Sequence, residues 1–334
     1  MENDLVPPGL TYLADNIESH QNILGVTKEQ GARWAEGLGL AASGETVFFA
    51  GCGYQYSTQL EQLMNLSRAV DRTVIGSELP MRFARFQKKL GLNLPGIYST
   101  VISRGSMGEI MPLTSAIGVL RRIGIEPAYL AENEPCCGAA LNHAGLQTRF
   151  GENARRATTI LKSYGVKDII GIVPYCTHAL AKLFPRHVEG FDIRVRHFLQ
   201  IVSDNLPSLT LRFPKPVKIT YHDPCQLVRF LDIVDEPRRI LSAIENVEFV
   251  EPDWTKAEFA TCCGGGGGFE AVFPELSSML GVNRARELLD TGADIIATHC
   301  PGCVMQLKEG VRELGADKVQ VMDLAEVIAM AMSE

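Results

Sequence analysis

The sequence lacks the features that would place it across a membrane or on a nucleic acid. Its 334 residues contain no run of about 18 apolar residues, so we expect no transmembrane helix. The first residues carry neither a basic n-region nor an apolar h-region, so we expect no signal peptide. The net charge is −7 and no basic block occurs, which makes nucleic acid a poor candidate partner. We therefore expect a cytoplasmic protein, or one held at the periphery of a membrane through its partners.

Two common signatures of electron carriers are also missing. The sequence has no CxxCxxCxxxC run of the ferredoxin type and no flavin or nicotinamide fingerprint. The glycine run 264–268 resembles a phosphate cradle, but it lacks the lysine of a P-loop and the spacing of a dinucleotide site. Because the chain has no recognisable way to take electrons from a soluble carrier, we expect them to come from another protein of the same complex.

Cysteine, in contrast, is plentiful. The chain has nine, and an odd number without a signal peptide argues for metal or redox chemistry in a reducing compartment rather than a disulfide framework. Five of them come in three groups: Cys225, then the pair Cys262 and Cys263, then Cys300 and Cys303. A gap of 36 residues separates each group from the next, which is about one strand-plus-helix unit.

The residue types in these groups favour an inorganic cluster. Thiolates are soft ligands that select zinc, copper(I) or iron–sulfur clusters. The side chains of adjacent cysteines diverge, so a pair suits a polynuclear cluster in which each sulfur takes a different iron. Gly264 and Gly265 follow the pair, where they permit positive φ and leave backbone N–H groups to face the sulfurs. His222 and His299 lie near these cysteines in sequence and are candidate catalytic proton donors, with loop hydrogen bonding as the alternative.

Strand and helix signals alternate along the chain. Apolar runs predict strands at 46–50, 126–130, 168–173, 218–221, 247–250 and 294–298, and helices at 22–40, 60–70, 113–124, 154–164, 238–243, 283–289 and 321–332. This order predicts an α/β fold of two pseudo-repeated Rossmann-like domains with short parallel sheets. Ligands of such sheets lie beyond the carboxyl ends of the strands, and four cysteines follow predicted strands: Cys52, Cys176, Cys225 and Cys300. We expect clusters at these ends.

An internal repeat predicts the domain organisation. Cys137-Gly138 recurs as Cys263-Gly264, and the run 168–170 recurs as 294–296, both at an offset of 126. We expect a helical segment at 1–45, a first domain at 46–205 with an insertion at about 70–105, a proline-containing linker at 206–217, and a second domain at 218–334.

The second motif resembles a known family. The pattern Cys225, then Cys262-Cys263-Gly264, then Cys300-Pro-Gly-Cys303 is similar to the cysteine-rich CCG domain, and the resemblance covers about residues 46–310. That domain occurs twice in the B-type catalytic subunit of heterodisulfide reductase and in iron–sulfur subunits of related complexes. The resemblance implies a noncubane [4Fe–4S] cluster held by five cysteines: Cys225, Cys262, Cys263, Cys300 and Cys303. It also implies an oxidoreductase subunit that acts on a disulfide or thiol, alongside a ferredoxin-like iron–sulfur subunit or a flavoprotein subunit.

The first motif departs from this pattern. A gap of 83 residues separates Cys52 from Cys136, and the run 176–179 ends in Ala179 where the second motif has Cys303. Four candidate ligands remain: Cys52, Cys136, Cys137 and Cys176. They would hold a second iron–sulfur cluster of cubane or smaller type, a cluster completed by a histidine or exogenous ligand, or none.

Two other functions fit the same residues. One is an electron-transfer iron–sulfur subunit of a larger oxidoreductase, of the aromatic-degradation or 2-hydroxy-acid oxidase type, without its own substrate site. The altered first motif favours this alternative. The other is a zinc-stabilised scaffold, against which the adjacent cysteine pairs argue.

Overall fold

The computed structural model describes residues 6–62 and 111–332. Within these ranges the strands form two parallel sheets. The first has the order β1-β2-β3, from β1 (Thr46–Phe49), β2 (Asp168–Gly171) and β3 (Arg194–His197). The second has the order β5-β4-β6-β7, from β4 (Arg212–Tyr221), β5 (Glu245–Val250), β6 (Ile295–Thr298) and β7 (Gln320–Asp323). All pairings are parallel, which confirms the predicted α/β class with short parallel sheets.

Helices follow most of these strands. In the first half they are α1 (Pro8–His20), α2 (Lys28–Ala32), α3 (Gly51–Gln55), α7 (Met111–Arg122), α8 (Ala139–His143), α9 (Gln147–Ser163), α10 (Pro174–His178), α11 (Phe184–His187) and α12 (Phe198–Asp204). In the second half they are α13 (Cys225–Phe230), α14 (Asp235–Ser242), α15 (Phe269–Val272), α16 (Pro274–Leu289), α17 (Pro301–Glu313) and α18 (Leu324–Ala331). Short 3-10 turns are η1 (Arg33–Ala35), η2 (Ala131–Asn133), η4 (Leu206–Ser208) and η5 (Ala257–Phe259), and η3 (Ala179–Leu183) is a π-helical turn between α10 and α11. No described helix has both the length and the apolar character needed to cross a membrane.

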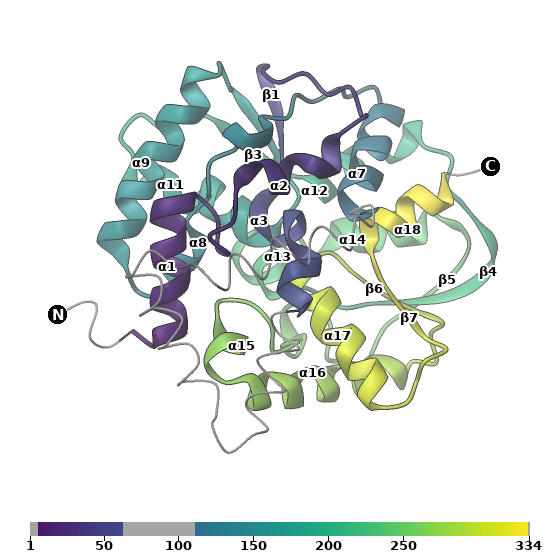
Figure 1. Cartoon of the computed structure of the whole chain (residues 1–334). Helices are drawn as coiled ribbons and strands as arrows, with labels where there is room; N and C mark the ends of the chain where they lie inside the picture. Colours follow the sequence, from purple (N-terminus) through teal and green to yellow (C-terminus); the bar gives the residue numbers. More distant parts are fainter. Residues whose placement is uncertain (1–5, 63–110, 333–334) are drawn as a thin grey trace.

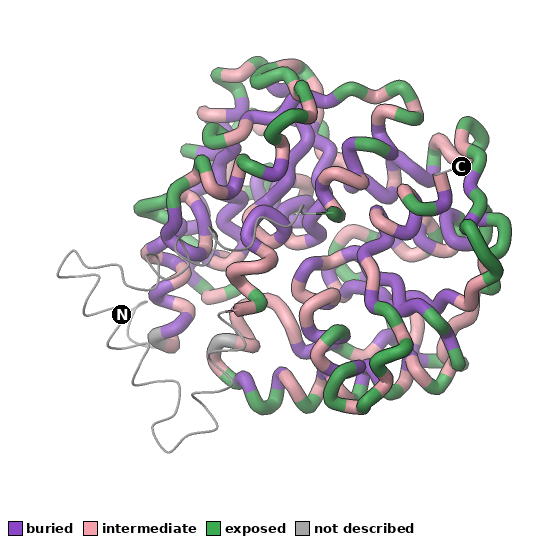
Figure 2. Tube along the Cα trace, turned by 45° about the vertical axis from the view of Figure 1, so that its right-hand side comes forward, coloured by how far each residue is buried: buried purple, intermediate pink, exposed green. Residues whose placement is uncertain are grey.

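One continuous core joins the two halves. Most of β1, β2 and β6 is buried, which is why these segments read as uninterrupted apolar runs. Figure 1 shows most of the first half, purple to teal, at the upper left and most of the second half, green to yellow, at the lower right. Buried chain runs through both (Figure 2). The C-terminal helix α18 packs against α7 of the first half, so the halves share apolar contacts rather than standing apart.

Three predicted elements differ from the structure. The segment 126–130 makes only a single bridge, between Val47 and Ala128, because Pro127 cannot donate to a ladder. The predicted helix at 321–332 begins as strand β7, and α18 starts only after Asp323, whose carboxylate accepts from the backbone N–H of Ala325. Strand β4 begins at Arg212, inside the predicted linker 206–217. Its register shifts before Val217, where prolines are tolerated.

The N-terminal region is also less helical than predicted. Of the predicted helix at 22–40, only α2 and the turn η1 form. Asn22 explains the loss, because its side-chain oxygen accepts from the backbone N–H groups of Leu24, Gly25 and Val26 and fixes a turn there. Residues 60–62 are helical, whereas the rest of the helix predicted at 60–70, and the insertion predicted at 70–105, lie outside the described residues.

The structure extends the repeat beyond what the sequence revealed. His197 and Asp323 are separated by the same offset of 126, and each ends a strand and caps the helix that follows, α12 or α18. Both caps are completed by a side chain three residues on, Gln200 or Glu326. The repeated unit therefore includes β3 with α12 and β7 with α18, which differ too much in composition to be matched by eye.

Candidate metal centre

The second motif is assembled at the carboxyl edge of the second sheet. Cys225 opens α13 shortly after β4 ends, and Cys300 is the N-cap of α17 directly after β6. The two strands are parallel neighbours, with Tyr221 opposite Ala297, so their carboxyl ends lie together. Cys303 lies in the first turn of α17. The sheet topology thus gathers three of the five thiols.

The glycine-rich loop brings the remaining two thiols to this edge. The sulfur of Cys263 lies 3.2 Å from the sulfur of Cys303. The backbone N–H of Gly264 donates to the sulfur of Cys262 at 3.3 Å, and that of Gly265 donates to the sulfur of Cys263 at 3.4 Å. These amides lie at the sulfurs, as a polynuclear thiolate site requires.

The five thiols range from buried to exposed. Cys263 and Cys303 are buried, Cys225 and Cys300 are partly buried, and Cys262 is exposed. Hydrogen bonds from the thiols of Cys262 and Cys303, followed by one from His222, hold the pKa of Cys263 well below its ordinary value. Burial, with the charges of Cys300 and Cys263, raises the pKa of Cys225 to about 11. The group therefore has a dry interior and one side open to solvent.

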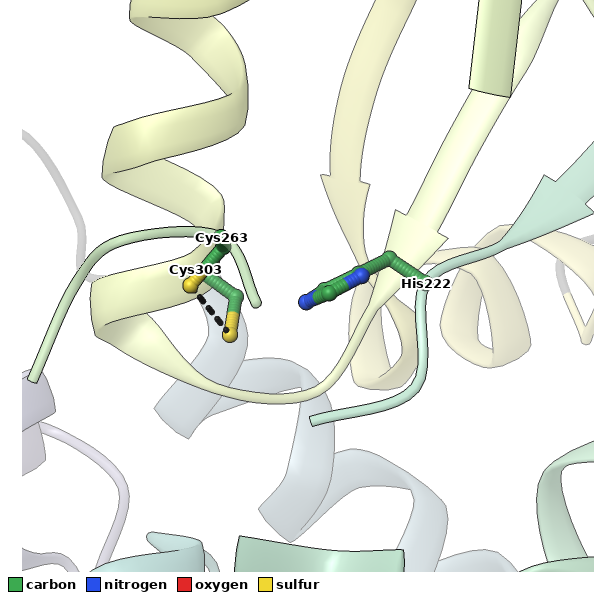
Figure 3. Close-up of side chains that lie close together, drawn as sticks. All are labelled: His222, Cys263 and Cys303. Carbon is green, nitrogen blue, oxygen red and sulfur yellow. Dashed lines mark hydrogen bonds between the residues drawn. The ribbon is translucent and has the colours of Figure 1, made fainter. Parts of the chain in front are cut away.

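His222 is the histidine closest to these sulfurs. A ring nitrogen of His222 and the sulfurs of Cys263 and Cys303 lie within 4.8 Å of one another. In Figure 3 the ring reaches from the end of β4 toward both sulfurs. The guanidinium of Arg284 on α16 donates to its Nδ1 at 3.0 Å, and both residues are buried. Arg284 is a contact that the sequence reading missed, because its helical position on α16 resembles that of any surface arginine.

The first motif forms a similar group beside the first sheet. The sulfurs of Cys137 and Cys176 are 3.1 Å apart, and the backbone N–H of Gly138 donates to the sulfur of Cys136 at 3.4 Å. Hydrogen bonds from the thiols of Cys137 and Cys52 hold the pKa of Cys136 well below its ordinary value. The four thiols of the first motif therefore converge as well.

Gly51 lets the chain approach this first group closely. Its φ is +66°, and a Cβ there would lie 2.8 Å from the sulfur of Cys176. A larger residue at this position would displace a thiol of the group.

Charged groups that the sequence reading did not single out surround these four thiols. Glu134 is buried and accepts from the backbone N–H groups of Ala50 and Gly51 at 2.8 and 2.9 Å. Burial raises its pKa to about 7. The ammonium of Lys28 donates to the carbonyl oxygen of Glu134. Nothing in the local sequence marks Lys28, which is 106 residues away in the chain.

The structure corrects the alignment of the two motifs. Cys176, not Ala179, is the counterpart of Cys303, because each lies two residues after a proline that opens a helix, and each sulfur meets the second cysteine of a pair. The residue before each proline is an N-cap in extended conformation, Val173 in α10 and Cys300 in α17. The first motif therefore lacks the counterpart of Cys300, and Val173 stands in its place.

The two thiol groups face each other across the junction of the halves. The charge of Cys300 is among the influences that raise the pKa of Cys176, after burial and nearer groups. A Cβ on Gly53, next to Cys52, would lie 2.9 Å from Cγ of Pro301, next to Cys300. The halves thus place the groups within electrostatic reach of each other.

His299, the second predicted proton donor, lies in a different buried network. Its Nδ1 lies 2.8 Å from Oδ1 of Asp323, and the hydroxyl of Tyr54 in the first half donates to the other oxygen of that carboxylate. Its ring stacks on Phe198. Nε2 of His299 is buried and has no partner among the described residues. His178, the nearby histidine of the first motif, packs its ring on Phe230.

The donor set fits an iron–sulfur cluster. All nine cysteines are free thiols, although two pairs of sulfurs lie near 3 Å. Each group combines soft sulfur ligands with backbone N–H donors, and neither has the oxygen ligands that magnesium or calcium prefer.

Comparison with known proteins identifies the repeated unit. The model of the cysteine-rich domain, CCG, matches residues 108–181 and 219–308. The D-type subunit of the dihydromethanophenazine:CoB–CoM heterodisulfide reductase of Methanosarcina barkeri is 37% identical over 220 residues, which cover 64% of this chain and 53% of that protein. The B-type subunit of the fumarate reductase (CoM/CoB) of Methanothermobacter marburgensis is 31% identical, covering 65% of this chain and 42% of that protein. The EtfAB:quinone oxidoreductase of Syntrophomonas wolfei is 32% identical, covering 65% and 31%.

The chain spans about half the length of the heterodisulfide reductase subunits that it matches, and less of the other two relatives. The first family-model match contains Cys136, Cys137 and Cys176, and the second contains all five thiols of the second motif. The chain belongs to the cysteine-rich CCG-domain family, whose domain it carries twice.

Proposed function

We propose that this chain is an iron–sulfur redox subunit of a multi-subunit oxidoreductase and that it performs disulfide/thiol chemistry at a noncubane [4Fe–4S] cluster in its second motif. The observation that carries the proposal is the convergence of five thiols from three loops at the carboxyl edge of one parallel sheet. The relatives named above are oxidoreductases or their subunits, two of them named for CoM and CoB.

The residues of the second motif have distinct roles in this proposal. The ligands would be Cys225, Cys262, Cys263, Cys300 and Cys303. When bound, the cluster would supply one-electron redox chemistry for a disulfide/thiol pair. Cys263 and Cys303 exclude water from the inner side, whereas exposed Cys262 leaves the outer side accessible to a small molecule. The N–H groups of Gly264 and Gly265 offset the negative charge of the sulfurs.

The first motif would hold a second cluster on four thiols and pass electrons to the second. Two features support this order. Val173 removes one ligand from the first group, and the charge of Cys300 reaches Cys176 across the junction. Electrons would enter from a ferredoxin-like iron–sulfur subunit or a flavoprotein subunit. His222 and His299 stay candidate proton donors, although both are fully buried.

A second candidate function is an electron-transfer subunit without a substrate site. The relative named as an EtfAB:quinone oxidoreductase favours it, since that name mentions no disulfide. The two functions differ in one property, which is whether a disulfide reaches the second cluster.

The test begins with iron and acid-labile sulfide in protein purified without oxygen. Replacing Cys263 by serine should remove iron from the second motif and abolish turnover, whereas replacing Cys176 should remove iron from the first motif alone. Addition of 2-hydroxyethyl disulfide should then change the EPR signal of the wild-type second cluster. An unchanged signal would favour the electron-transfer function, and zinc without iron would rule out both.

A further inference from the structure

The environment of the second thiol group contains a buried positive charge that the first group lacks. Arg284 on α16 is completely buried, which is rare for arginine and costs free energy unless its donors are paired. Its Nη1 donates to the carbonyl oxygen of Thr255 at 2.9 Å and to Oε2 of Glu287 at 2.7 Å. Its Nε donates to Nδ1 of His222 at 3.0 Å. These contacts fix the guanidinium firmly between the loops of the second motif.

The contact with His222 determines where the imidazole carries its proton. A guanidinium donates and does not accept, so the Nδ1 that faces it must present its lone pair. In a neutral imidazole the proton is then on Nε2, the nitrogen that remains to face the sulfurs. The backbone holds the ring in this direction, because the N–H of His222 donates to the carbonyl oxygen of Ala297 and its own carbonyl oxygen accepts from Oγ1 of Thr298.

This arrangement decides between two roles for His222. A nitrogen that carries a proton has no lone pair for a metal, so the nearness of His222 to Cys263 and Cys303 is not ligation. It places an N–H donor at the sulfur of Cys263, and a hydrogen bond from His222 to that sulfur is among the influences on it. Figure 3 shows the ring end directed at the two sulfurs.

The repeat supplies an internal comparison. Aligning Cys225 with Cys52 puts Phe49 at the position of His222, and the offset of 126 puts Thr158 at the position of Arg284. Phe49 has no polar side-chain atom, and the hydroxyl of Thr158 donates to the carbonyl oxygen of Ala154 in its own helix. The first group therefore has no equivalent donor pair at these two positions.

We propose that Arg284 is a positioning residue that holds His222 in the Nε2–H form, so that His222 hydrogen-bonds the Cys263 thiolate and raises the reduction potential of the second cluster selectively. This inference rests on the proposed function, since it requires a cluster at the second motif. Hydrogen bonds to ligand sulfurs favour the reduced, more negative state of a cluster, so their loss should lower its potential.

The experiment uses the full chain purified without oxygen, with iron and sulfide counted first. His222→Phe copies the residue of the first motif, and Arg284→Met removes the guanidinium while keeping an apolar side chain of similar length. Both variants should shift the potential of the second cluster downward and leave that of the first unchanged. Arg286→Met, on the exposed side of the same helix, is the control and should shift neither. Arg284→Met also leaves Glu287 without its ion pair, so His222→Phe provides the independent reading if the arginine variant does not fold.

Pulsed EPR of protein labelled with ¹⁵N-histidine provides the second readout. Wild-type protein should show only the weak nitrogen coupling of a hydrogen-bonded histidine. Strong coupling, typical of coordinated nitrogen, would overturn the inference while leaving the iron–sulfur proposal intact. An unchanged potential in His222→Phe would also overturn it. Protein that holds no iron or sulfide would refute the proposed function, and this inference with it.

Discussion

The glycine directly after the second cysteine pair offers a test of the site that removes no ligand. Gly264 has φ +82°, and a Cβ built on it would lie 2.3 Å from the carbonyl oxygen of Ser277 in α16. Real Cβ atoms essentially never approach another heavy atom within 3.0 Å, so the loop and the helix would have to separate by at least 0.7 Å. The displaced atom is backbone in a helix and cannot rotate away.

The magnitude follows from two separate costs. Placing alanine in the left-handed region costs about 1–2 kcal/mol. Overpacking against rigid backbone adds about 1–3 kcal/mol. Gly292 provides the matched control, because its φ is +70° and a Cβ there would meet no heavy atom within 4 Å. Gly264→Ala should therefore cost about 1–3 kcal/mol more than Gly292→Ala, a difference of roughly 5- to 150-fold in an equilibrium.

The assay is iron retention against a chelator, with thermal unfolding measured alongside. Gly264→Ala should lose the iron of the second motif at chelator concentrations that leave Gly292→Ala fully loaded, while the iron of the first motif is retained by both. If the two variants lose iron together, the loop does not hold the ligands in the way that the structure indicates.

Two further substitutions test the loop before Cys225 and the altered first motif. Arg238→Met leaves the fully buried carboxylate of Asp223 without its bidentate partner and should lower stability by about 3–5 kcal/mol, whereas the exposed Arg239→Met should change it little; equal melting temperatures would contradict this. Val173→Cys restores a fifth thiol to the first motif and should change the EPR signature of that cluster while the second stays the same, and a wild-type spectrum would mean that Val173 does not occupy a ligand position.

Part of the fold was predictable because its signals are local. The buried strands β1, β2 and β6 appear in the sequence as short apolar runs, and their spacing implies crossover helices and parallel pairing. The segment 126–130 has the same apolar character but forms only one bridge, since Pro127 removes a donor. The start of β4 at Arg212 was hidden by prolines that a shifted edge register tolerates.

The cysteine motifs were predictable for a chemical reason. Residue type determines which metals a side chain can bind, and the spacing between groups matches the length of a repeated unit, so the candidate ligands follow from the sequence. The alignment of the first motif was wrong because counting from Cys176 ignored the proline that opens each helix. Only the structure shows that Val173 and Cys300 occupy the same N-cap position.

The sequence by itself determined the class of the fold, the family of the repeated domain and the soft-ligand character of both thiol groups. The tertiary structure alone decided which side chains surround those groups. Arg284 is 62 residues from His222 in the chain, and Lys28 is 106 residues from Glu134, so no local pattern could reveal either contact. Such contacts arise because a parallel sheet gathers the ends of distant strands at one edge, and their geometry depends on how the helices pack around that edge.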